Sequence, residues 1–453
     1  MSTTLARPST GKVKCVGAGE RVLFSVFLVG AALLLGVSVG TNHWLFAVML
    51  LALPLVLQWP VRVSLGLFAL LLPFDAISVL GQGKSGTTLT FVVGGAATLV
   101  LMFTALAGNR FTAPPRAALW WSLFVIWSVS TAFWALNAEL SWQRVPTALA
   151  LLLMFLVTVS VRITPGELSC VELCAIVGGF AAAVYSTAQF YSGIFYRGAL
   201  SMRASMIAGG REEDPNQFAV VLLLPIALAL GRLFSTHNRL ERTLLTIVTG
   251  VIGLGVFLTM SRGVIFALSV LVLFFVYRLR VGWRALIPVC TLLSLCLVVP
   301  ESFFARLRGA VSSRAAGRFD IWIAGIQAIW HHGLWGAGLD NFSTTYSEVA
   351  GAAPTFSGFA RDSHNIYIGM LVELGIIGFL FFACALRSQL RDAAQVSGSM
   401  HGIGQYRLLS YQAACYGMLA AGISLDIVWR KSFWLCWMLL AVTTSFSRRQ
   451  ARS

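Results

Sequence analysis

One histidine stands where an acid–base group could act. His364 lies at the boundary between a polar stretch and a long apolar run, and Asn365 follows it. An imidazole at such a boundary is partly desolvated, which favours its neutral, proton-accepting form. The alternative interpretation is that His364 and Asn365 only cap and anchor a helix. Position alone leaves both interpretations open.

A second group of candidates consists of cations near the ends of apolar runs: Lys84, Arg203, Arg211, Arg262, Arg314 and Arg318. Arg262 is the most informative, because Ser261-Arg262-Gly263 forms the whole turn between two apolar runs. A partly buried guanidinium group there needs an anion or a carboxylate beside it. Several guanidinium groups together suit a diphosphate, whose oxygens they bind through paired hydrogen bonds. Alternatively, these residues pair with acids such as Asp214 and Asp320, or reach lipid headgroups.

Other catalytic patterns are absent from the sequence. It contains no GxxxxGK[ST] phosphate loop, no HExxH motif and no outward pair of aspartates suited to a metal ion. Gly336-Ala337-Gly338 resembles part of a nucleotide-binding loop but lacks a surrounding βαβ pattern. The eight cysteines form no CxxC, which argues against a disulfide framework and a zinc site. We therefore expect no metal and no cofactor, and a reaction whose energy is already stored in its substrate.

The composition excludes a soluble enzyme. Hydrophobic residues make up 58% of the 453 residues, charged residues only 11%, and the mean hydropathy is +0.82. In soluble domains about a quarter of the residues are charged. A net charge of +16 would suggest a nucleic-acid partner in a soluble chain. Here the basic residues lie in short loops between apolar runs, so we expect membrane lipids as partners and no nucleic acid.

Apolar runs long enough for membrane-spanning helices recur along nearly the whole chain. They predict an all-α, polytopic integral membrane protein with an even number of spans, between 12 and 14. The candidate runs are 22–38, 44–59, 63–80, 89–106, 117–136, 146–161, 171–191, 218–231, 243–260, 264–277, 285–300, 364–385, 408–425 and 432–446.

The distribution of Lys and Arg orients these spans, because basic residues in short loops stay on the cytoplasmic side. Both termini are predicted to be cytoplasmic, and the outward connections include 81–88, 192–217 and 301–363. We therefore divide the chain into helices with short loops (1–300), a large outward loop (301–363) and C-terminal spans (364–453). Long loops in compact membrane proteins usually carry function.

The large outward loop contains a predicted amphipathic helix, within the sequence RFDIWIAGIQAIWHH from residue 318 to residue 332. Its apolar side chains recur at helical spacing on one face, so the helix should lie on the membrane or on the transmembrane bundle. The residues of this stripe are Phe319, Trp322, Ile323, Ile326, Ile329 and Trp330.

The motifs together resemble those of the bacterial O-antigen ligases, which belong with the O-antigen polymerases and related membrane glycosyltransferases. The most specific match is His364-Asn365, nine residues, Gly375, two residues and Gly378. Supporting matches are GREEDPNQF, FLTMSRG and the run RFDIWIAGIQAIWHHGLWGAGLDNF that begins at Arg318. The first 190 residues match in hydropathy only.

This resemblance implies a GT-C-like membrane protein of the bacterial inner membrane with a periplasmic active site. It implies transfer of a polysaccharide from undecaprenyl diphosphate, the donor, to a sugar hydroxyl of the lipid A core, the acceptor, in an inverting, metal-independent reaction. His364 would accept or orient the proton of the attacking hydroxyl, and Arg211 and Arg262 would hold the diphosphate. Arg314, Arg318 and Lys84 are further candidates for the same anion, and Asp214 and Asn216 would brace the loop.

Several alternatives stay open. The arginine that precedes the Asp214-Pro215-Asn216 run varies in spacing within the family, so Arg203 rather than Arg211 could be the functional one. An O-antigen polymerase would use the same donor with a different acceptor, and a protein oligosaccharyltransferase is a third enzyme of this kind. A transporter or flippase is the alternative from another class, although transporters place ionisable residues near the bilayer midplane. The acids within the runs include Asp75 and Glu373.

Overall fold

A computed structural model of the chain describes residues 54–75, 77–80, 87–196, 202–208, 211–279, 318–349, 361–398 and 400–450. By its internal contacts the chain divides into Met1–Pro60 and Val61–Ser453, and the account below concerns the second unit. The predicted spans 22–38 and 285–300, most of 44–59, and the candidates Lys84 and Arg314 lie outside the described residues.

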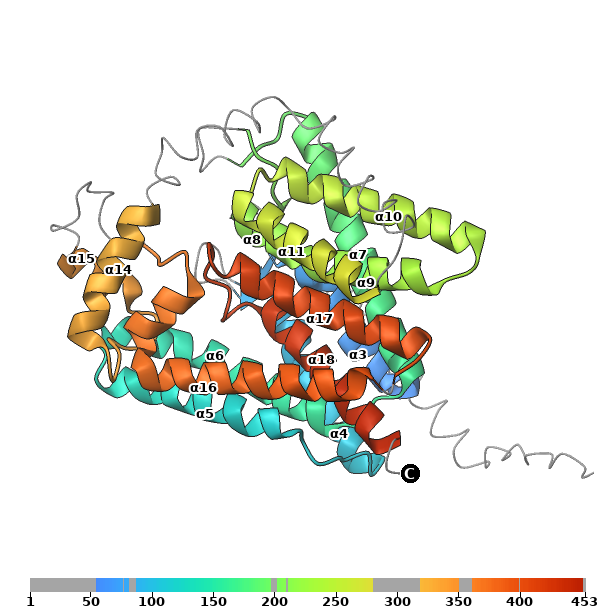
Figure 1. Ribbon diagram of the computed structural model, residues 1–453, viewed down its shortest axis with the longest axis horizontal. Helices are drawn as coiled ribbons and strands as arrows, with labels where there is room; N and C mark the ends of the chain where they lie inside the picture. Colours follow the sequence, from blue (N-terminus) through green and yellow to red (C-terminus); the bar gives the residue numbers. More distant parts are fainter. Residues whose placement is uncertain are drawn as a thin grey trace, which may run out of the picture. The chain divides into compact units, whose positions relative to one another are not determined.

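The first half of the described chain is helical apart from one small hairpin (Figure 1). Strands β1 and β2 of that hairpin are antiparallel, with Ser78 opposite Thr88. The elements are α3 (Pro60–Leu71), η1 (Leu72–Phe74), β1 (Ser78–Leu80), β2 (Thr87–Thr88), α4 (Leu89–Ala107), α5 (Arg116–Ser130), η2 (Thr131–Phe133), α6 (Ala138–Ser160) and α7 (Pro165–Tyr191).

The second half repeats this pattern of long helices after one further short hairpin, β3–β4, in which Ala208 lies opposite Arg211. The elements are β3 (Ile207–Ala208), β4 (Arg211–Glu212), α8 (Pro215–Val221), α9 (Leu223–Ser235), α10 (Arg239–Leu258), α11 (Arg262–Leu279), α14 (Arg318–His332), α15 (Phe342–Val349), α16 (Ile366–Ser397), α17 (Ile403–Ala421) and α18 (Lys431–Gln450).

Seven helical stretches among the described residues are long and apolar enough to cross a membrane. The prediction of an all-α polytopic membrane protein is confirmed at this level, whereas the number of spans stays a prediction. The seven are Leu89–Ala107, Ala138–Ser160, Pro165–Tyr191, Pro215–Ser235, Arg239–Leu258, Arg262–Leu279 and Ile366–Ser397.

One predicted span differs from the structure. The run 63–80 was expected to be one apolar helix, but α3 ends at Leu71 and the 3₁₀ turn η1 and strand β1 follow. Pro73 lies inside the turn and interrupts the helical hydrogen bonds there. Asp75, directly after the turn, binds Lys431 at 2.7 Å, which fixes this chain segment to the start of α18.

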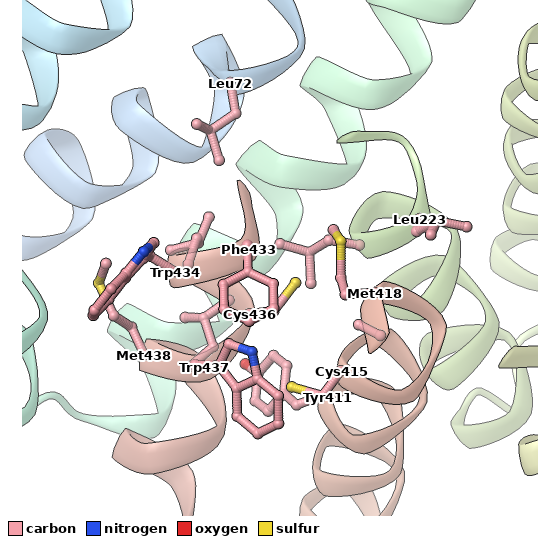
Figure 2. Packing of buried hydrophobic residues seen from close by; sticks show 14 of the residues in the cluster. Leu72, Leu223, Tyr411, Cys415, Met418, Phe433, Trp434, Cys436, Trp437 and Met438 are labelled. Atoms are coloured by element: carbon pink, nitrogen blue, oxygen red, sulfur yellow. The ribbon is translucent and has the colours of Figure 1, made fainter. Parts of the chain in front are cut away.

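Helix α18 is buried on all sides from Ser432 to Thr444. Phe433, Trp434 and Trp437 are completely buried, as expected for a helix enclosed by others. Figure 2 shows these side chains beside Tyr411 and Met418 of α17. Large aromatic side chains from distant segments of the chain therefore hold the bundle together.

Helix α16 is broken at Gly375, whose φ of 67° and ψ of −174° are accessible essentially only to glycine. The segment before α15 fills the break: Ala337 N–H donates to the Val372 carbonyl at 2.8 Å and Gly338 N–H to the Glu373 carbonyl at 2.9 Å. Ile376 N–H donates to the Gly333 carbonyl at 2.8 Å. Backbone groups released by the break are thus satisfied inside the protein, as an apolar environment requires.

The predicted amphipathic helix is confirmed as α14 and lies close to α16 (Figure 1). Its small residues face the protein: Ala324 and Ala328 are buried in a cluster with Val372 of α16. The expected apolar stripe is largely exposed, with Trp330 86% exposed. The sequence predicted that this stripe lies either on the membrane or on the transmembrane bundle. Its most exposed side chains do not pack on the bundle.

Candidate functional site

His364 lies immediately before α16 in a backbone conformation that is uncommon for its residue type. Its φ is 46°, in the left-handed region. Ser363 fixes the turn, because its buried hydroxyl accepts from Asn365 N–H at 3.3 Å and donates to the Asn365 carbonyl at 3.0 Å. Gly369 leaves room for this hydroxyl, since a Cβ there would lie 2.7 Å from the Ser363 Oγ. The turn thus orients His364 separately from the helix that follows.

Asn365 caps α16. Its Oδ1 accepts from Tyr367 N–H at 2.9 Å and from Ile368 N–H at 3.1 Å, the pattern of a helix N-cap. The sequence suggested that His364 and Asn365 cap this helix, and in the structure Asn365 is the cap residue. His364 precedes the cap.

Burial and neighbouring charges act together on His364. Its pKa lies below the ordinary histidine value, first because the ring is desolvated and then because Arg318 disfavours a second positive charge nearby. Asp362 and Asp214 oppose this effect, and Arg361 adds to it. The imidazole is therefore neutral at neutral pH and can accept a proton. The charged groups that act on the ring thus include Arg318 at the start of α14 and Asp214 just before α8.

The loop between α17 and α18, residues 422–430, connects the segments that carry the predicted site residues. The Gly422 carbonyl accepts from Ile366 N–H at 2.8 Å, at the start of α16. Arg430 forms an ion pair with Glu213 at 3.1 Å. The Asp426 carbonyl accepts from the side chain of Gln217, in α8, at 3.1 Å. We call this segment the α17–α18 loop.

Arg262 is the first residue of α11 and is half-buried. Gly263, next to it, approaches the α17–α18 loop so closely that a Cβ would lie 1.8 Å from the Ser424 Oγ. The Ser261-Arg262-Gly263 turn thus places its arginine beside the loop that also binds the start of α16. The glycine of this motif is required by that close approach.

Arg211 lies in β4, two residues before Glu213, the residue that pairs with Arg430 of the α17–α18 loop. Asp214 caps α8 by accepting from Asn216 N–H at 2.8 Å. The sequence predicts that Asp214 and Asn216 brace this loop. Asn216 also binds Arg203, because the Arg203 Nη2 donates to the Asn216 Oδ1 at 2.8 Å.

Arg203 is buried, being 6% exposed. Its Nε donates to the Thr259 carbonyl at 2.8 Å, at the end of α10. Together with the bond to Asn216, this contact ties the segment before β3 to both α8 and α10. These two contacts give Arg203 a structural role.

Charged residues that the sequence did not single out surround the site. Arg144 in α6 forms an ion pair with Asp340 at 2.9 Å, although 196 residues separate them in the chain. Burial raises the pKa of Asp426 to about 6, against the opposing effect of Arg144. The sequence offered a signal only for Asp426, which lies among the charged residues of 426–431. In the described ranges, no group of three His, Cys, Asp or Glu residues could hold a metal ion.

The fold is that of a polytopic, helical membrane protein, and His364, just before α16, is influenced electrostatically by Arg318 at the start of α14 and by Asp214 before α8. Residues 246–383 match the family described as O-antigen ligase, and this match supports the resemblance over that part of the chain. The match runs from α10 into α16 and includes Arg262, Arg318 and His364. In a comparison with curated proteins, nothing matches the chain.

Proposed function

We propose that this protein is an O-antigen ligase, a membrane glycosyltransferase that joins a lipid-linked polysaccharide to the lipid A core. The donor is the polysaccharide on undecaprenyl diphosphate, and the acceptor is a sugar hydroxyl of the core. The reaction takes place at the periplasmic face of the bacterial inner membrane, in an inverting and metal-independent manner. The observation that carries this proposal is the neutral, half-buried His364 beside Arg318 and close to the α17–α18 loop.

In the proposed mechanism the acceptor oxygen attacks the anomeric carbon of the donor sugar in a single displacement. The new glycosidic bond forms as the bond between that carbon and the diphosphate oxygen breaks. The proton of the attacking hydroxyl passes to the neutral imidazole of His364. The electron pair leaves with undecaprenyl diphosphate, so negative charge grows on the phosphate oxygens.

The arginines stabilise that developing charge. Gly263, next to Arg262, and Glu213, two residues after Arg211, both contact the α17–α18 loop, and Arg318 acts on His364 itself. In proteins, removing one positioned donor of this kind lowers the rate by about 10² to 10³. Arg314 and Lys84 are proposed as further ligands of the diphosphate or of phosphates on the core.

The family match also fits a polymerase-like enzyme, and the accumulated lipids separate the two functions. Deleting the gene should leave long polymer on undecaprenyl diphosphate and bare lipid A core if the protein is a ligase. Loss of a polymerase would instead leave single repeats attached to the core. Single repeats on the core would therefore contradict the proposed function.

A further inference from the structure

An apolar groove of about 260 Å³ lies between α4 and α6, away from His364. On α4 it is lined by Phe91, Gly95 and Leu99, and on α6 by Thr147, Leu153 and Met154. Several of these side chains are open to the surroundings of the bundle: Leu99 is 61% exposed and Leu153 is 52% exposed. Because α4 is a candidate span, this open side faces lipid rather than water.

One end of the groove is polar. Lys431 lines it together with Thr90, and its Nζ donates to the Thr90 hydroxyl at 2.7 Å and to the Thr88 hydroxyl at 2.9 Å. Asp75 completes the cluster by pairing with the same ammonium group at 2.7 Å. The apolar part extends from this end over about 14 Å of α4, at 1.5 Å per residue between residues 90 and 99.

The polar end of the groove lies next to the α17–α18 loop. Lys431 directly follows Arg430, the residue of the α17–α18 loop that pairs with Glu213. Asp75 and Lys431 both act electrostatically on Glu213, as does Asp214. Asp214 in turn acts on His364. The polar end of the groove is thus next in the chain to the loop that pairs with Glu213 and contacts the start of α16.

We propose that this groove holds the isoprenoid chain of the lipid-linked donor next to its diphosphate. This inference rests on the proposed function, because it assigns a binding site to the lipid part of the same substrate. An isoprenoid chain is apolar and branched, and an apolar channel with small residues in its wall accommodates branches. Its diphosphate would leave the groove at the Lys431 end, toward the arginines.

Gly95 offers a way to close the groove without disturbing the protein. A Cβ at Gly95 would meet no atom within 4 Å, so a large side chain has space there. Gly94, its neighbour, is unsuitable because a Cβ would lie 3.0 Å from the Phe68 ring. Ala96 is an exposed residue of the same helix that does not line the groove, and Ala96→Trp is therefore the matched control.

The kinetic test compares ligation by the wild type, Gly95→Trp and Ala96→Trp in lipid nanodiscs. Gly95→Trp should raise the KM for the long-chain donor at least about tenfold, which corresponds to a loss of roughly 1.4 kcal/mol of binding. The KM for the lipid A core acceptor and the behaviour of Ala96→Trp should stay unchanged. Equal donor KM values for the two variants would overturn the groove assignment while leaving the proposed function intact.

A second test measures binding of the isoprenoid chain in the groove directly and does not require ligation activity. A polyprenyl diphosphate with a photoreactive chain should label peptides 91–99 and 147–154 in the wild type, and Gly95→Trp should abolish this labelling. Excess unlabelled polyprenyl diphosphate should compete, whereas phosphatidylglycerol should not. Equal competition by phosphatidylglycerol would show an ordinary lipid contact and overturn the inference. Labelling without any ligation would refute the proposed function alone.

Discussion

His364 combines a strained backbone, partial burial and a positive neighbour. A left-handed conformation at a residue other than glycine costs of order 1–3 kcal/mol and tends to occur where function requires it. Here Ser363 and the cap residue Asn365 hold the turn. The ring is thereby placed where burial and Arg318 keep it unprotonated.

Arg318 should control the pH dependence of the reaction. The neutral imidazole is the active form, and its lowered pKa keeps it neutral to a more acidic pH than an ordinary histidine. Replacing Arg318 with Ala removes one cause of the lowering, so the pKa should rise. The acidic limb of the kcat/KM profile should then move to higher pH.

The conservative variant Arg318→Lys is the control for this experiment, because it keeps the positive charge. Its acidic limb should stay near that of the wild type, even if the rate falls through altered diphosphate binding. An acidic limb in Arg318→Ala at the wild-type position would show that the charge of Arg318 does not act on the proton acceptor.

At the scale of elements, the break in α16 explains the glycines of the family motif. Gly375 lies where the helix opens, and a Cβ there would lie 2.3 Å from the Leu334 carbonyl oxygen. Gly336 approaches from the other side, with a φ of 81°. The two glycines allow two backbone segments to meet, which positions the chain before α15 against the helix that follows His364.

Gly375→Ala should therefore destabilise the protein by about 1–3 kcal/mol from backbone strain, with a further cost from the clash. The measurement is thermal unfolding of the detergent-solubilised protein. Gly398→Ala is the matched control in the cap of the same helix: its φ is −73° and a Cβ would meet no atom within 4 Å. It should change stability by about 0.5 kcal/mol or less. Equal unfolding midpoints for both variants would contradict the structural role of Gly375.

Local patterns in the sequence were sufficient to predict the long helices, the helix α14 and a helix that starts directly after His364-Asn365. Helical periodicity and capping residues are local features that extend over a few positions, so they can be recognised in the sequence without knowledge of the tertiary structure. The run 63–80 was interpreted wrongly as one helix, because hydropathy does not register Pro73 or the ion pair of Asp75 with Lys431.

The α17–α18 loop could not be predicted in this way. Its role depends on Gly422, Asp426 and Arg430 meeting residues 50 to more than 200 positions away. Likewise, the pairing of Arg144 with Asp340 follows from the packing of α6 against the segment before α15. Such contacts are set by tertiary structure and leave no periodic signal in the sequence.

At the scale of the whole molecule, the proposal requires the α17–α18 loop to face the periplasm. The positive-inside distribution predicts this orientation. Arg361 and His237 are both exposed and lie on opposite sides of the membrane in the predicted topology. A membrane-impermeant maleimide should label Arg361→Cys in cells whose outer membrane is permeabilised, but label His237→Cys only after the inner membrane is opened.

The wild type serves as the background for this labelling, because Cys170, Cys174 and Cys384 are partly exposed. Labelling of His237→Cys and not Arg361→Cys from the periplasmic side would reverse the topology. The proposed reaction would then lie on the wrong face of the membrane.

The most direct test of the account is ligation by purified protein with two defined substrates, lipid-linked polysaccharide and lipid A core. The wild type should form a ladder of ligated product without a nucleotide or an added metal ion. His364→Ala should be slower by about 10² to 10⁴, the usual contribution of a general base, whereas the exposed His237→Ala should match the wild type. Full activity in His364→Ala would contradict the catalytic role of His364, and a wild type that forms no product would contradict the proposed function itself.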